Sequence, residues 1–249
     1  MFIGFGTLIN VATVLVGSTI GVLVGHRLPE RTRDVVTDGL GLVTLLIAGL
    51  SAMAVVDPVL SDAVGDSAPV LIVLGAVLIG GIAGSLLRVE DRLEGVGGWL
   101  RRRLGGSGAG SADRARFIEG FVTASLVFCV GPLTVLGSLD DGLGRGSDQL
   151  VLKAALDGFA SIAFAASFGW GVAASALAIL VVQGTLTALG ALLGSFVPEP
   201  QLLALTATGG LLLAGVALRL LRIRAVPVGD LLPALVVAPL LVQLVVTFR

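Results

Sequence analysis

Residues 117–168 read FIEGFVTASLVFCVGPLTVLGSLDDGLGRGSDQLVLKAALDGFASIAFAASF, and this stretch decides the fold of the chain. It holds an apolar helix interrupted at Gly131-Pro132, an acidic turn at 140–142, and a second apolar helix that carries Lys153 and Asp157. Lys153 is the only lysine in the chain. Charged groups are costly inside a membrane span, so their presence here needs a physical reason.

The composition is that of a multi-pass membrane protein. The chain has 249 residues, of which 55% are hydrophobic and 13% charged, and its mean hydropathy is +1.04. A soluble domain has about 25% charged residues. Because one span needs about 20 apolar residues, the chain has room for seven or eight. We predict an all-α, polytopic membrane helix bundle with about eight transmembrane helices.

The spans are predicted from the apolar segments of the sequence. These segments cover residues 4–24, 36–56, 69–87, 117–139, 150–168, 172–197, 202–221 and 228–248. The whole chain, 1–249, is predicted to be a single integral membrane domain. Residues 88–116 are predicted to be a cytoplasmic linker rich in arginine and glycine.

The positive charges predict the orientation. Thirteen of the 16 Lys and Arg residues lie in three clusters, which follow the first, third and seventh segments. Positively charged loops stay in the cytoplasm. With eight spans, all three clusters are cytoplasmic when both termini are outside. The opposite loops carry acidic residues such as Asp57, Asp140 and Glu199, so we expect both termini outside.

The arginines at 101–103, next to Trp99, suit an anionic lipid surface, where each cation near the headgroups contributes about 1 kcal/mol. Ordinary positive-inside topology accounts for the same residues. The expected partner is therefore the lipid bilayer, and nucleic-acid binding is not expected.

Small residues recur four apart, as in Gly17, Gly21 and Gly25, and again at 76–84 and 190–194. Such a stripe lets helix backbones approach closely. It predicts a tight bundle, but it leaves open whether the packing lies within one subunit or builds a homo-oligomer.

Two stretches resemble each other: residues 21–30, GVLVGHRLPE, and residues 190–199, GALLGSFVPE. They close the first and the sixth segments, so the two copies face opposite ways across the membrane. Transporters with inverted repeats have this arrangement, which here would relate spans 1–3 to spans 6–8. Chance similarity among helices rich in Gly, Leu and Val is the alternative.

Gly131 and Pro132 predict a hinge in the fourth segment, because proline cannot donate the helical hydrogen bond and glycine offers little resistance to bending. Carbonyl groups freed near Cys129 and Thr134 then need other partners. Broken helices line substrate sites in transporters. A plain proline kink is the alternative.

Lys153, Asp157 and Ser161 are four residues apart and therefore share one helix face. An unpaired buried carboxylate takes up a proton, whereas pairing with Lys153 keeps both groups charged. Either behaviour serves ion or proton coupling, and a pair that only fixes helix packing is the alternative. Asn10 and Gln183 lie at similar depths in the two repeat helices and are able to bond across helices.

The sequence gives no sign of enzyme chemistry. It has no phosphate-binding loop, zinc-ligand cluster or nucleophile elbow. The single cysteine, Cys129, excludes a multi-cysteine zinc site. We predict no enzymatic activity, no metal site and no cofactor.

Three runs carry a resemblance to a known family: FCVGPLTVLGS at 128–138, DDGL at 140–143 and KAALDGFAS at 153–161. With GTLIN at 6–10 and LPER at 28–31, they resemble the signature of the YqgA/YdfK-type family of bacterial inner-membrane proteins. The resemblance covers nearly the whole chain and implies a location in the bacterial inner membrane. That family is one of unknown function, and its members are described only as candidate transporters or as affecting biofilm formation.

We therefore expect a transporter of a small solute or ion, with a polar path centred on the fourth and fifth spans. The expected path residues are Asn10, Thr134, Ser138, Asp141, Lys153, Asp157, Ser161 and Gln183, with Gly131 and Pro132 as the hinge. The alternatives are a non-transporting sensor or assembly partner related to biofilm, and a passive channel.

Overall fold

The computed structural model describes residues 2–25, 29–104, 111–129, 132–193 and 198–248. In these ranges the chain forms helices joined by turns, without strands, which confirms the all-α prediction. The helices are α1 (Phe5–Gly25), α2 (Glu30–Ala52), η1 (Met53–Val56), α3 (Pro58–Val64), α4 (Ala68–Leu87), α5 (Val89–Leu104), α6 (Ser111–Cys129), α7 (Pro132–Gly142), α8 (Asp148–Phe168), α9 (Gly171–Leu193), α10 (Glu199–Leu220), α11 (Val228–Leu231) and α12 (Ala234–Phe248).

Within the described residues, seven helical stretches are long and apolar enough to cross a membrane, which confirms the multi-pass class. The predicted fourth span is a pair of helices, α6 and α7, inclined to one another by 76°. Counting that pair as one broken span gives eight crossings, and counting it as a re-entrant element gives seven. The predicted number of eight therefore depends on this pair.

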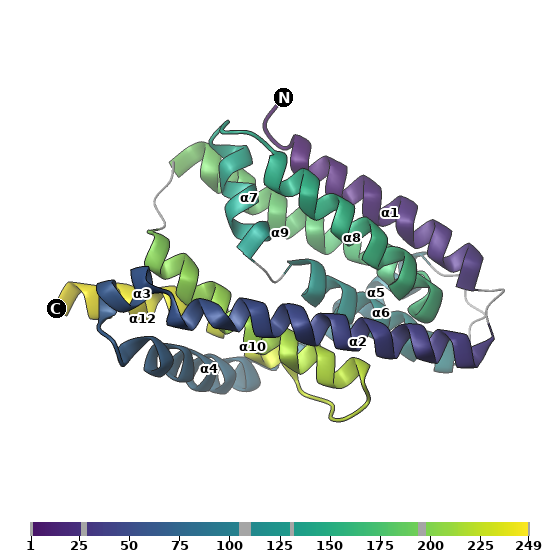
Figure 1. Ribbon diagram of the computed structural model, residues 1–249. Coiled ribbons are helices and arrows are strands. Elements are labelled where there is room, and N and C mark those ends of the chain that lie inside the picture. Colours follow the sequence, from purple (N-terminus) through teal and green to yellow (C-terminus); the bar gives the residue numbers. More distant parts are fainter. Residues whose placement is uncertain (1, 26–28, 105–110, 130–131, 194–197, 249) are drawn as a thin grey trace. The chain divides into compact units, whose positions relative to one another are not determined.

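The chain folds into two compact units, each made of two separate segments. Unit 1 contains residues Met1–Leu40 and Leu93–Ser195, and unit 2 contains Gly41–Arg92 and Phe196–Arg249. Two of the three boundaries fall inside α2 and α5, and the third, at 195–196, lies outside the described residues. Figure 1 labels the helices, and unit 1 holds α1 together with α6 to α9.

Unit 1 is built on close contact between α1 and α8, which lie side by side in Figure 1. A Cβ atom placed on Gly17 would overlap the carbonyl oxygen of Gly158, and one on Gly21 would overlap the carbonyl oxygen of Ile162. A Cβ on Gly25 would stand 2.5 Å from the backbone oxygen of Ala166. The predicted glycine stripe is thus confirmed as a close-packing face, and it is used within one chain.

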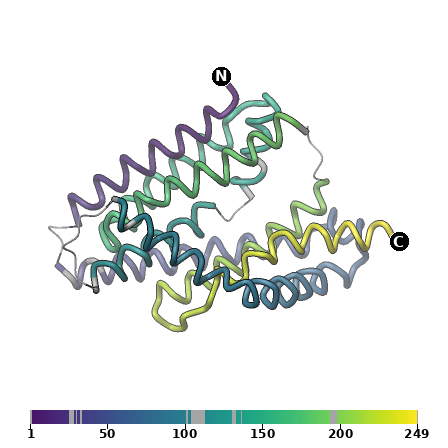
Figure 2. The backbone as a smooth tube through the Cα atoms, turned by 180° about the vertical axis from the view of Figure 1, so that it is seen from behind, coloured from purple at the N-terminus to yellow at the C-terminus, as the bar shows by residue number. Residues whose placement is uncertain are grey.

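Unit 2 has the same kind of close glycine packing, between α4 and the helices α11 and α12. A Cβ on Gly80 would overlap the backbone of Ala234, and one on Gly84 would overlap the backbone of Asp230. Figure 2 shows α4 and α12 running together. The buried core of this unit comprises Leu60, Val64, Ile72, Ala76, Ala204, Ala238 and Val242.

Two helices lie outside the predicted spans. The short helix α3 falls in a predicted loop, where the Asp57 carboxylate caps it by accepting from the Val59 amide at 2.9 Å. Pro58 follows the cap, the first-turn position that tolerates proline. Helix α5 occupies the first part of the predicted linker at 88–116, and the glycine-rich centre of that linker, 105–110, lies outside the described residues.

Candidate functional site

The face of α8 predicted from four-residue spacing points into unit 1. Lys153 is 6% exposed, Asp157 is 7% exposed and Ser161 is fully buried. The Lys153 ammonium donates to Oδ2 of Asp157 and forms an ion pair with it. Taking two charges out of water costs several kcal/mol per ion, and a close pair with further hydrogen bonds offsets part of that cost.

The further hydrogen bond comes from α1. Nδ2 of Asn10, a fully buried side chain, donates to Oδ2 of Asp157 at 3.0 Å. The predicted cross-helix bonding of Asn10 is confirmed, and its partner is the carboxylate itself. Asn10, Lys153 and Asp157 form one cluster, called the charged cluster below. Protonation of Asp157 would remove the counter-charge of Lys153, so this cluster has two distinct electrostatic states.

Ser161 lies one turn further along α8, where its hydroxyl donates to the Gly158 carbonyl at 2.7 Å. It lies against Gly17, since a Cβ at that glycine would overlap the Ser161 hydroxyl oxygen. It therefore contributes to the contact between α1 and α8, and its hydroxyl bonds within α8.

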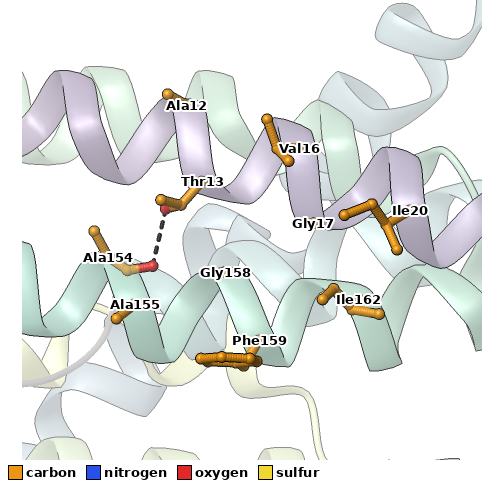
Figure 3. A pocket seen from close by; sticks show the side chains of 10 residues that line it. All are labelled: Ala12, Thr13, Val16, Gly17, Ile20, Ala154, Ala155, Gly158, Phe159 and Ile162. Atoms are coloured by element: carbon orange, nitrogen blue, oxygen red, sulfur yellow. Dashed lines mark hydrogen bonds between the residues drawn. The ribbon is translucent and has the colours of Figure 1, made fainter.

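A shallow groove of about 340 Å³ runs along the outer side of the α1–α8 contact (Figure 3). In Figure 3 the hydroxyl of Thr13, on α1, donates a hydrogen bond to the Ala154 carbonyl, on α8, at 2.9 Å. Phe159, on its edge, is 75% exposed. The lining is apolar and excludes Lys153 and Asp157, so this groove is a surface for hydrocarbon and the charged cluster is a separate site.

Helices α6 and α7 both pack against α8, the helix that carries Lys153 and Asp157. Cys129, the last residue of α6, is within electrostatic range of both Lys153 and Asp157. The Thr134 hydroxyl, on α7, donates to the Phe128 carbonyl at 3.2 Å. A carbonyl freed by the break therefore finds a side-chain partner, as predicted from Gly131-Pro132.

Of the two predicted hinge residues, Pro132 is the first residue of α7, and Gly131 lies outside the described residues. Pro132 occupies the first helical position, where its missing N–H costs nothing. The hinge itself remains a prediction.

The structure places Asp141 away from the charged cluster, at the end of unit 1 where α1 begins. Its Oδ2 accepts from the Gly4 amide at 3.1 Å. A carboxylate in this position stabilises the positive end of the helix dipole. Asp141 thus fastens the start of α1 to α7.

Gln183 and Ser138 are fully buried, as expected for path residues, yet their side chains have no hydrogen-bond partner within the described residues. Gln183 lies on α9, which packs against α1. Beside it, the hydroxyls of Thr7 on α1 and Thr187 on α9 share a hydrogen bond of 3.4 Å. The sequence reading missed both threonines, although each is one turn from a polar residue already singled out.

A second polar network, partly buried in unit 2, was also missed. Glu90 pairs with Arg219, its Oε2 accepts from the Gly229 amide, and its own amide donates to Asp230 at 2.9 Å. Glu90 lies on α5, Arg219 on α10, and Gly229 and Asp230 on α11, so the network joins three helices. In the sequence, the only indication of this network is that Asp230 follows the arginines at 219–224.

In the part of the chain that the structure describes, no group of three or more His, Cys, Asp or Glu side chains is placed to hold a metal ion.

Comparison with known proteins gives one family and two similar relatives. A family model described as "Protein of unknown function (DUF554)" matches residues 5–243. The chain is 25% identical over 244 residues to the "Uncharacterized membrane protein YdfK" of Bacillus subtilis, covering 98% of each chain. It is 29% identical over 233 residues to the "Uncharacterized protein YqgA" of Escherichia coli, covering 94% of each. No solved structure matches.

Proposed function

Because the chain belongs to the DUF554 family of proteins of unknown function, we propose its function from the site itself: it transports a small solute or ion across the bacterial inner membrane. The charged cluster in unit 1 is the coupling centre, and the protein acts without enzymatic chemistry. The observation that carries this proposal is a buried ion pair, with an amide bonded to it, on two helices that are apolar enough to span a membrane.

The energetics favour a functional role for the pair. Helices α1 and α8 already touch backbone to backbone through Gly17 and Gly21, so charges are not needed to hold them together. Apolar side chains of similar volume would fill the same space at lower cost than a buried ion pair. Ionisable groups within spans commonly mark ion or proton pathways.

In the proposed cycle, Asp157 takes up a proton, and Lys153 then loses its counter-charge. The freed ammonium becomes a contact for an anionic solute or drives a rearrangement of its surroundings. The α6–α7 pair, whose two helices both pack against α8, is the element proposed to move. Broken helices allow such movement because their backbone bonds are already satisfied locally.

Reconstituted flux tests this role. Phosphatidylethanolamine–phosphatidylglycerol vesicles containing the protein and a trapped pH dye receive, one at a time, small carboxylates, amino acids, inorganic anions and monovalent cations. Wild type should change the internal pH with at least one of them, and Asp157→Asn should not. Asp148→Asn, which removes an exposed carboxylate from the start of the same helix, is the matched control and should behave as wild type.

The same measurement separates the alternatives. If Asp157→Asn changed the internal pH as the wild type does, Asp157 would not be the coupling group. A wild-type protein that lets a solute equilibrate, but does not accumulate it against its gradient when a pH gradient is imposed, would be a passive channel. If the wild type changed the internal pH with none of the solutes, a non-transporting sensor or assembly partner would be favoured.

We also propose that both termini are outside, which requires the α6–α7 pair to cross the membrane once. If the pair were re-entrant, the arginines at 219–224 would lie outside, contrary to the distribution of positive charge. Alkaline phosphatase fused after residue 249 should be active, and phosphatase fused after residue 224 should be inactive. The reverse pattern would make the pair re-entrant.

The inverted repeat of spans 1–3 and 6–8 stays a proposal. Its support is local: Thr7, near the start of α1, meets Thr187, near the end of α9, so these two helices run antiparallel. Two copies related by an axis in the membrane plane would pack in this way.

A further inference from the structure

The contact between α1 and α9 carries polar side chains at two successive levels. Thr7 and Thr187 share a hydrogen bond of 3.4 Å at the first level. Asn10 follows Thr7 by three residues, and Gln183 precedes Thr187 by four. Because the helices are antiparallel, these steps bring Asn10 and Gln183 to the same second level. We call these four residues the polar seam.

The second level is short of hydrogen bonds. Oδ1 of Asn10 and both polar atoms of Gln183 are buried and have no partner within the described residues. Leaving a buried polar group unsatisfied costs about 1–3 kcal/mol. A primary amide offers two donors and an acceptor oxygen, so Gln183 alone leaves several bonds unmade. Buried water is the usual partner of such groups, and it typically makes about three hydrogen bonds.

The polar seam runs from the end of unit 1 where α1 begins to Asp157. At one end, the Thr187 carbonyl lies against Gly142, the neighbour of Asp141, at the end of unit 1 where α1 begins. At the other end, Asn10 bonds to Asp157 at 3.0 Å. Between them lie two hydroxyls and two amides, with apolar helix faces on either side.

We propose that the polar seam holds a chain of water molecules that carries protons between the end of unit 1 where α1 begins and Asp157. This inference rests on the proposed coupling role of Asp157 and adds its access route. The amides of Asn10 and Gln183 hold the waters, and the hydroxyls of Thr7 and Thr187 relay protons with them. An O–H bond forms on Asp157 as one breaks in the adjacent water, which takes a proton from its neighbour, so one proton enters from solution.

A metal cation is a poorer occupant than water. The seam offers amide and hydroxyl oxygens that suit a sodium ion, but its inner end meets the Lys153–Asp157 pair. The lysine ammonium neutralises the carboxylate and repels a second cation at this short range. Neutral water meets no such repulsion, and an arriving proton forms a covalent O–H bond on Asp157, whereas a metal cation would stay beside the ammonium as a second charge.

Silver ion is the probe for this route, because it reacts with thiols, travels through water and is excluded from hydrocarbon. In a Cys129→Ala background, single cysteines replace Gln183 or Thr7. Matched controls on the same helices replace Val181, which is 58% exposed, and Leu8, which is 50% exposed. The controls lie at nearly the same depths but face lipid. The readout is the loss of maleimide labelling after denaturation.

Gln183→Cys should react with silver at least about tenfold faster than Val181→Cys, because an ion pays several kcal/mol to enter hydrocarbon and each 1.4 kcal/mol is tenfold. Thr7→Cys should exceed Leu8→Cys in the same way. Equal slow reaction of seam and control cysteines would overturn the water chain. Because this measurement needs no transport, it stays distinct from the flux test of Asp157→Asn.

A second readout follows the proton itself. Infrared spectroscopy after a pH jump detects a protonated carboxyl band, which is assigned to Asp157 by its loss in Asp157→Asn. Gln183→Leu should slow the appearance of this band about tenfold, a barrier increase of about 1.4 kcal/mol. Gln201→Leu, which removes a glutamine bonded to the exposed Gln243, is the matched control. An unchanged rate in Gln183→Leu would contradict the route.

Discussion

Gly17 and Gly158 meet backbone to backbone: the position that a Cβ atom would take on Gly17 is already filled by the carbonyl oxygen of Gly158. The contact brings α1 and α8 closer than any larger side chain would allow. Since apolar side chains gain little by leaving lipid, such close packing is a principal source of helix association in a membrane. It also fixes the distance across which Asn10 reaches Asp157.

Gly21→Ala should destabilise unit 1 by about 1–3 kcal/mol, because the added methyl overlaps the Ile162 carbonyl and backbone cannot move aside cheaply. Gly184→Ala, on α9, is the control, since the added methyl meets open space. The measurement is unfolding in mixed micelles with increasing SDS, followed by tryptophan fluorescence. Equal midpoints for the two variants would contradict the packing assigned to Gly21.

Lys153→Met and Asp157→Leu should each lower the free energy of unfolding by about 3–5 kcal/mol, because each leaves one charge buried without its partner. The double variant should lose clearly less than the sum of the two, since it removes both charges together. The same SDS titration gives all three values. Additive losses would show that the two side chains do not stabilise one another.

Asp141→Ala should loosen the start of α1, because the Gly4 amide loses the carboxylate that accepts its hydrogen bond. The loss of a cap of this kind costs about 0.5–2 kcal/mol. Hydrogen–deuterium exchange of the peptide at 2–10 should become faster, whereas Asp148→Ala should leave it unchanged. Unchanged exchange in Asp141→Ala would return this residue to the candidates for the polar path.

Glu90→Gln should destabilise unit 2 by about 1.5–3 kcal/mol, the range for hydrogen bonds to charged groups. The carboxylate joins Arg219 and the Gly229 amide, and both side chains of the ion pair are mostly buried. Glu94→Gln, four residues along and exposed, should have little effect. A similar loss in both variants would mean that the Glu90 network contributes no stability of its own.

The spans were predictable because length and hydropathy fix them. Seven predicted segments match helical stretches to within a few residues, apart from the short bends near 53 and 232. Helix α3 was not predictable from hydropathy because seven residues are too few, although Asp57-Pro58 is a helix start signal. The division into two units was also out of reach, since a glycine stripe shows that a face packs closely and not which helix it meets.

The charged cluster was predictable where the chemistry is local. Four-residue spacing placed Lys153, Asp157 and Ser161 on one face, and all three are buried. The bond from Asn10 to Asp157 joins positions 147 residues apart. The sequence therefore indicated that Asn10 was able to bond across helices, but not which residue it would meet. Thr7 and Thr187 lie one turn from Asn10 and Gln183, but threonine is common in spans, and only the antiparallel contact makes the two a pair.

Helix α1 is synthesised well before α8, the helix that it packs against. Asp148, where α8 starts, follows the end of α1 by 123 positions. At about 5–20 residues per second, α1 waits roughly 6–25 s in the membrane before its partner is made. During that time its glycine face and Asn10 are uncovered. Early insertion of this protein therefore calls for a temporary neighbour, whether the insertion machinery or another nascent helix, that shields α1 until α8 arrives.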